Sequence, residues 1–156
     1  MKLDYVHTYD ADPERVVALL RNEDFLTDVA QHAGALEHSV AVNPDNTCLN
    51  MALPVPANLA KFVGSSIKIN QTFHFEAPRP DGVINGTVTV DVVGMPVDVN
   101  AQAEMLPKDG TTEGRYTGDL LVKIPLVGKK VEAQVEPFIR NAFAGLERRA
   151  ADWLSR

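Results

Sequence analysis

The stretch from Val127 to Arg156 constrains the fold more than any other part of the sequence. Apolar residues recur there at steps of three and four, which places them on one face of an α-helix. They are Val131, Val135, Phe138, Ala142, Leu146, Ala150 and Trp153, with Ile139, Phe143 and Leu154 widening the stripe. Charged residues such as Glu132, Glu136 and Arg140 are expected on the opposite face. Because most of the preceding chain has strand patterning, the sequence predicts that this helix buries its apolar stripe against a sheet.

Alternating apolar and polar residues predict the strands of that sheet. The predicted strands cover residues 2–9, 36–42, 47–53, 66–76, 83–93, 97–105 and 111–124. Clean alternation implies one buried and one solvated face, as in an antiparallel sheet. Two short helices are expected after the first strand, with Asp12 and Asn22 as their N-caps and Gly34 ending the second. A third short helix is predicted over 57–64, and a turn over 107–110.

Composition and charge narrow the possible functions. The 156 residues suit one domain, and no repeat or linker divides them. A net charge of −6 disfavours nucleic acid and anionic membrane surfaces as partners. Cys48 is the only cysteine, and the sequence has neither a signal peptide nor an apolar run of membrane-spanning length, so we expect a cytoplasmic protein without membrane insertion. Nucleotide-binding, nucleophile-elbow and metal-ligand patterns are missing, so no cofactor, metal or catalytic residue is predicted.

The order of the predicted elements resembles the helix-grip fold of the START and Bet v 1-like (SRPBCC, polyketide cyclase-like) superfamily. Within it, Lys2-Leu3-Asp4-Tyr5, Asp12-Pro13-Glu14 and a long terminal helix interrupted by Pro137 resemble an actinobacterial family of unknown function, DUF2505. The resemblance covers essentially the whole chain. It implies an α+β domain over residues 1–156, with a curved seven-stranded antiparallel sheet wrapped on the C-terminal helix. It also implies a cavity between sheet and helix that often holds a lipid, sterol, polyketide or other apolar molecule.

The inward rows of the predicted strands supply the candidate cavity residues. Their polar members are Tyr5, His7, His38, Gln71 and Tyr116, and a buried polar group needs a partner in the protein, in water or in a ligand. Their small members are Gly86, Ala101, Ala103 and Gly118, which fit either sheet curvature or room for a ligand. The set is completed by Met51, Phe62, Phe73, Val88, Val99, Leu120, Val135, Phe138 and Ile139. Leu59, Phe62 and Val63 fit either the rim of an entrance or a plug in the core.

Three functions are compatible with this pattern. The leading hypothesis is a non-catalytic protein that binds or carries a small apolar molecule. The second is a polyketide cyclase-like enzyme that uses Tyr116, His38 or His7 as acid or base. The third is a regulatory partner protein with a filled core and no ligand. Two ionisable groups around one void would favour the enzyme, whereas an apolar void with isolated polar groups would favour the carrier.

Overall fold

The structure is a computed structural model that describes residues 1–156, apart from the side chains of Leu59, Phe62 and Val63. The strands are β1 (Lys2–Tyr9), β2 (Glu37–Val42), β3 (Thr47–Pro54), β4 (Ser66–Phe75), β5 (Ile84–Val92), β6 (Val97–Lys108) and β7 (Thr111–Val122). The helices are α1 (Pro13–Leu20), α2 (Glu23–His32), α3 (Ala57–Val63) and α4 (Gly128–Leu154). The interpretation of Leu59, Phe62 and Val63 as rim or plug lies outside the described side chains.

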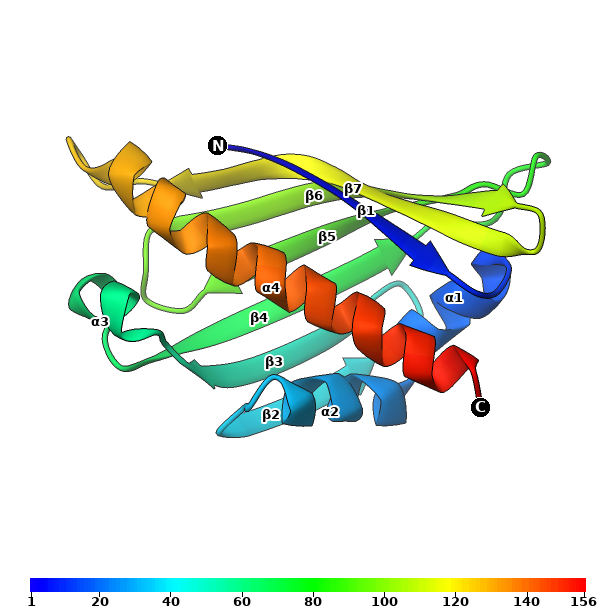
Figure 1. The fold of residues 1–156 in the computed structure, drawn as a ribbon, viewed down its shortest axis with the longest axis horizontal. Helices are drawn as coiled ribbons and strands as arrows, with labels where there is room; N and C mark the ends of the chain where they lie inside the picture. Colours follow the sequence, from blue (N-terminus) through cyan, green and yellow to red (C-terminus); the bar gives the residue numbers. More distant parts are fainter.

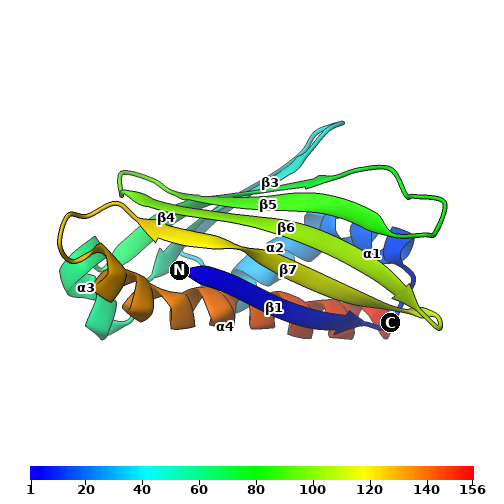
Figure 2. The same ribbon diagram turned by 90° about the horizontal axis from the view of Figure 1, so that it is seen from above.

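The strands form one seven-stranded sheet in the order β1-β7-β6-β5-β4-β3-β2, and every neighbouring pair is antiparallel. β1 and β2 are therefore the two edges. Figure 1 shows α4 running across the face of this sheet, with α2 beside β2 and the C-terminal half of α4. The view from above shows sheet and α4 as two layers (Figure 2). The predicted α+β helix-grip architecture is confirmed.

Local sequence signals set the ends of several elements. The Asp12 carboxylate accepts a hydrogen bond from the Arg15 N–H at 2.9 Å, and the Asn22 side chain accepts one from the Phe25 N–H at 2.9 Å. Both are N-caps, as predicted. The predicted turn over 107–110 is wrong in extent, because β6 continues through Lys108. The reversal needs only Asp109 and Gly110, whose φ angles of 48° and 85° are those of a two-residue hairpin turn.

α4 buries most of the predicted stripe, but Ala142 is exposed, so its predicted burial is wrong. Val131, Leu146 and Ala150 are 1%, 7% and 0% exposed, respectively. The expectation that Glu132 and Glu136 face solvent is wrong, because both are buried. Both carboxylates have partners within the protein. The Glu132 carboxylate accepts hydrogen bonds from the Met1 ammonium at 2.8 Å and from the Val122 N–H at 3.3 Å. One Glu136 oxygen forms an ion pair with Arg140. These partners offset much of the desolvation cost of Glu132, whereas the second Glu136 oxygen is buried without a hydrogen-bond partner among the described residues.

The edge strand β2 departs from the predicted inward row. Leu36 and Val42 are 65% and 47% exposed, His38 is exposed, and only Val40 packs against the core. The expected inward orientation of His38 is therefore wrong. β2 is the strand farthest from β1 and β7, which are the strands that α4 contacts most. Alternation alone carries no information about how far the helices cover an edge strand.

Candidate ligand-binding site

A cavity of about 490 Å³ lies between the sheet and α4. Its floor comes from β3, β4, β5 and β6, its roof from α4, and its side wall from α2. The roof includes Val135, Phe138, Ile139, Phe143 and Leu146. The volume falls in the range of small-molecule sites, which are concave and mostly apolar with a few polar groups. The described lining follows that pattern.

The floor is built by strand register. Gln71 on β4 lies beside Leu49 on β3 and Val90 on β5, and Val90 lies beside Val99 on β6. These four residues form a continuous row on the inward face, and all of them line the cavity. Gln71 is half-buried, and its amide makes no hydrogen bond to another described residue. The amide therefore has free donors and an acceptor inside an apolar cavity.

The cavity lies over one half of the sheet because the other half is filled. α4 approaches β1 and β7, where the rings of Tyr9, Tyr116 and Phe143 occupy the inward face. A Cβ at Gly114 would lie 2.7 Å from the Tyr9 ring, and one at Gly86 would lie 2.5 Å from the Phe75 ring. A Cβ at Gly118 would collide with the backbone of the neighbouring strand. Neighbouring rings and backbone thus already occupy the space beside these glycines.

The structure brings together part of the predicted residue set. Eight predicted residues line the cavity: Met51, Gln71, Phe73, Val88, Val99, Val135, Phe138 and Ile139. Their role in binding stays a prediction. Six others lie in closely packed parts of the domain, outside the lining: Gly86, Ala101, Ala103, Tyr116, Gly118 and Leu120. Tyr5 and His7 lie on the far side of α4, His38 lies on exposed β2, and the side chain of Phe62 lies outside the described part.

Sequence reasoning missed the contribution of α2. Leu26, Val29, His32 and Ala33 form the side wall of the cavity. The sequence predicts a short helix between Asn22 and Gly34, but the pattern of a helix does not reveal which edge of the sheet it covers. Val90 and Val92 alternate with polar residues along the predicted strand 83–93, but alternation alone gives no reason to prefer their end of the sheet.

A buried hydrogen-bonded chain joins His7, Tyr9 and Tyr116. The His7 Nδ1 lies 2.8 Å from the Tyr9 hydroxyl, which lies 2.7 Å from the Tyr116 hydroxyl. Burial lowers the pKa of His7 and raises the pKa of both tyrosines. At neutral pH this keeps the imidazole uncharged and the hydroxyls protonated. Phe143, whose ring centroid is 5.3 Å from that of Tyr116, lines the cavity, whereas none of the three linked residues does.

Tyr5 and His7 instead border a second hollow of about 470 Å³ between β1 and α4. Its lining includes five charged residues, namely Lys2, Asp4, Glu136, Arg140 and Glu147. The Glu147 carboxylate also accepts a hydrogen bond from the Thr8 N–H on β1 at 2.7 Å. This hollow is polar and charged, which separates it chemically from the cavity on the other side of α4.

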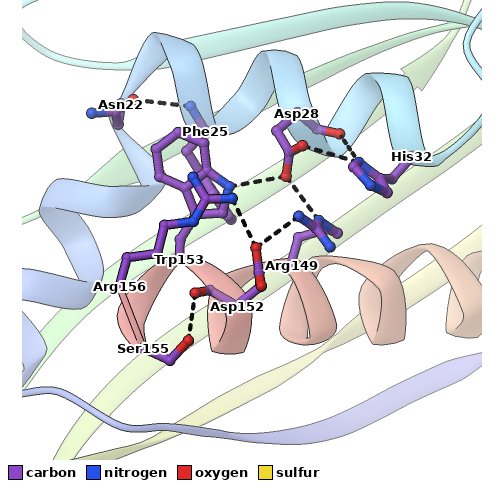
Figure 3. Close-up of polar contacts among 9 residues, drawn as sticks. All are labelled: Asn22, Phe25, Asp28, His32, Arg149, Asp152, Trp153, Ser155 and Arg156. Carbon is purple, nitrogen blue, oxygen red and sulfur yellow. Dashed lines mark hydrogen bonds and ion pairs between the residues drawn. The ribbon is translucent and has the colours of Figure 1, made fainter.

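A polar cluster fastens α2 to the C-terminal end of α4 (Figure 3). The Asp28 carboxylate accepts from Arg149 Nε at 2.8 Å and from Trp153 Nε1 at 2.9 Å, and His32 Nδ1 lies 3.0 Å from it. Burial alone would raise the pKa of Asp28, but the hydrogen bonds from Arg149 and Trp153, with the charges of Arg149 and His32, outweigh it and lower that pKa. The Phe25 and Trp153 rings meet edge to face at 5.6 Å. These contacts, which we call the Asp28 clasp, hold α2 against α4 and so fix the side wall of the cavity.

The sheet, the gripping helix and the cavity between them define a helix-grip domain, and solved structures share this fold. A protein from Thermus thermophilus is 15% identical, with a TM-score of 0.66 over 96% of this chain and 97% of that one. The Zhui aromatase/cyclase from a Streptomyces species is 12% identical, with a TM-score of 0.64 over 100% and 94%. A STAR-related lipid transfer protein fragment from Xanthomonas axonopodis is 15% identical, with a TM-score of 0.64 over 99% and 86%.

The chain belongs to the family described as "Protein of unknown function (DUF2505)", whose model matches residues 4–154. The predicted family is thereby confirmed. No curated protein matches the sequence. Within the described residues, no helix is both long enough and apolar enough to cross a membrane. The described His, Cys, Asp and Glu side chains form no group of three or more that could hold a metal ion.

Proposed function

We propose that this protein binds or carries a small hydrophobic molecule in the cavity between the sheet and α4. The observation that carries the proposal is the chemistry of the cavity. Side chains of Val, Leu, Ile, Met and Phe make up most of its described lining, and the polar group on its floor is the Gln71 amide, which has no partner among the described residues. An apolar cavity of this kind favours an apolar guest, because binding removes apolar surface from water. The Gln71 amide would orient a guest that carries one hydrogen-bonding group.

Similar folds support the same class of ligand. The neighbours include a STAR-related lipid transfer protein, whose name gives lipids as its ligands, and an aromatase/cyclase. At 12–15% identity these likenesses concern the fold, so the choice between carrier and enzyme depends on the site itself.

The site supports a carrier better than a cyclase. Enzymatic proton transfer needs an acid or base within hydrogen-bonding reach of the bound substrate. His7 and Tyr116 are hydrogen-bonded to Tyr9, and Phe143 lies between them and the cavity. His38 is exposed on β2. The described lining contains one imidazole, that of His32, and it lies at the exposed edge beside Asp28. An apolar void with isolated polar groups is the arrangement that favours binding without catalysis.

The test is a binding measurement with a neutral apolar dye and one blocking substitution. We expect the fluorescence of Nile red to rise on addition of the protein. Val90→Phe adds a ring in the middle of the floor and should weaken binding at least about tenfold, since small volume changes are felt in a packed interior. Val42→Phe, the same change at a 47% exposed position on β2, is the matched control and should bind like the wild type. Equal binding by Val90→Phe, with native circular dichroism, would place the dye elsewhere and overturn the proposal.

A further inference from the structure

Apart from Gln71 on the floor, the polar members of the described cavity lining lie together where the cavity opens. The exposed lining residues are His32 and Ala33 at the end of α2, and Asn141, Ala142 and Arg148 on α4. The mouth is therefore between the end of α2 and the middle of α4. Although the sequence contains 21 Asp and Glu residues, the described lining contains none of them, whereas it includes Arg148 and Arg149. An acidic protein thus presents a cationic mouth.

Arg148 is the cation at this mouth that has no charged partner among the described residues. Arg149 is already paired with Asp28 at 2.8 Å and with Asp152 at 3.0 Å. The His32 imidazole lies 3.0 Å from the same Asp28 carboxylate. Arg148 makes no ion pair or side-chain hydrogen bond with any described residue. Its guanidinium is therefore free to pair with an external anion.

The backbone of α4 directs this guanidinium along the cavity mouth. Asn141, Gly145 and Arg148 follow one another at helical spacing on one face of α4, and all three line the cavity. Arg148 Nη2 lies 3.6 Å from the place where a Cβ of Gly145 would be, so the guanidinium lies over the glycine. Complementing the helix dipole does not account for the charge, because Arg148 lies more than one turn before Leu154, where α4 ends.

We propose that the ligand is a single-chain amphiphile with a carboxylate head group. Its apolar chain enters the cavity, and its head pairs with Arg148 at the mouth, within reach of the Asn141 amide. A guanidinium presents two parallel N–H donors that match the two oxygens of a carboxylate. This inference rests on the proposed binding function and adds to it the chemical class of the head group.

The experiment compares three ligands that share a ten-carbon chain: decanoate, decanol and decylammonium. Each is titrated calorimetrically into the wild-type protein at pH 7.5 and low salt. We expect decanoate to bind about tenfold more tightly than decanol, the effect of one partly exposed charge-assisted hydrogen bond, and decylammonium to bind most weakly. Raising the salt concentration should reduce the difference in affinity between decanoate and decanol, because the mouth is open to solvent and salt screens the charge of Arg148 there.

Two variants assign the preference to one side chain. Arg148→Gln should lower the affinity for decanoate about tenfold and leave decanol unchanged. Arg15→Gln removes the same charge from an exposed position on α1 and should change neither affinity. Equal binding of decanoate and decanol, or an unchanged preference in Arg148→Gln, would overturn the head-group inference while Nile red binding still supports the cavity. Failure of all three ligands would also overturn it, and Nile red would then decide separately whether the cavity binds apolar molecules.

Discussion

The Asp28 clasp between α2 and α4 permits a stability prediction worked from the structure. Asp28→Ala removes the acceptor of two hydrogen bonds, from Arg149 Nε at 2.8 Å and Trp153 Nε1 at 2.9 Å. The side chain of Asp28 is 18% exposed, so solvent replaces these bonds only in part. A hydrogen bond to a charged group contributes about 1.5–3 kcal/mol, and an orphaned partly buried donor adds a cost of its own. Since Arg149 retains Asp152, we expect a total loss of about 2–4 kcal/mol.

The pH dependence of this loss has a definite sign. The pKa of Asp28 is lowered in the folded protein, so its stabilisation is complete above the pKa of an unfolded aspartate and disappears as the pH falls through the folded value. The difference in unfolding free energy between wild type and Asp28→Ala should therefore be full at pH 7 and shrink below about pH 3.9. Urea denaturation across this range measures it, and the melting temperature at pH 7 should fall by roughly 5–15 °C.

Asp10→Ala is the control, because Asp10 is exposed and makes no side-chain hydrogen bond or ion pair with the described residues. Its effect should stay within about 0.5 kcal/mol. A loss in Asp28→Ala no larger than that of the control would show that the clasp does not stabilise the fold. A difference that is unchanged down to pH 3 would show that the ionised carboxylate is not the form that stabilises it.

Two further substitutions test the core on either side of Phe143. Leu146→Ala, at a 7% exposed roof position, should cost about 2–5 kcal/mol in urea melts, and a change within error would exclude Leu146 from the packed core. Tyr9→Phe removes the hydroxyl shared by His7 and Tyr116 and should cost about 1–3 kcal/mol, because two buried polar atoms lose their partner. Unchanged stability there would mean that the chain of hydroxyls contributes nothing to the fold.

The architecture could be predicted because its signals are local. Alternation along β4 to β7, the helical spacing of 127–156 and the caps at Asp12 and Asn22 each require only neighbouring residues. The predicted side-chain orientations were wrong where long-range contacts determine burial. Glu132 has the pattern of a solvated residue, yet it is buried because the chain terminus and Val122 reach it. His38 has the pattern of an inward residue, yet it lies on an edge strand that the helices leave exposed.

The position of the cavity was only partly predictable for the same reason. Inward glycines and alanines indicate missing side-chain volume, but the sequence does not say what fills it. Beside Gly114 it is the Tyr9 ring, and beside Gly86 it is the Phe75 ring. The remaining void lies over valines such as Val90, whose local pattern resembles that of any packed strand. Small inward residues therefore mark places where a neighbouring ring or backbone segment approaches closely. Only the three-dimensional structure shows where the packing leaves a void.

The most direct test of the central claim is a methyl NMR titration with Nile red. Val90 and Val99 on the floor and Ile139 on α4 line the cavity, whereas Val42 and Val93 are 47% and 53% exposed outside it. A ligand between sheet and α4 should shift the methyl signals of the first three strongly, through the ring currents of the dye, and leave the two exposed valines unchanged. Shifts confined to Val42 and Val93, with the cavity methyls unmoved at saturating dye, would contradict the account.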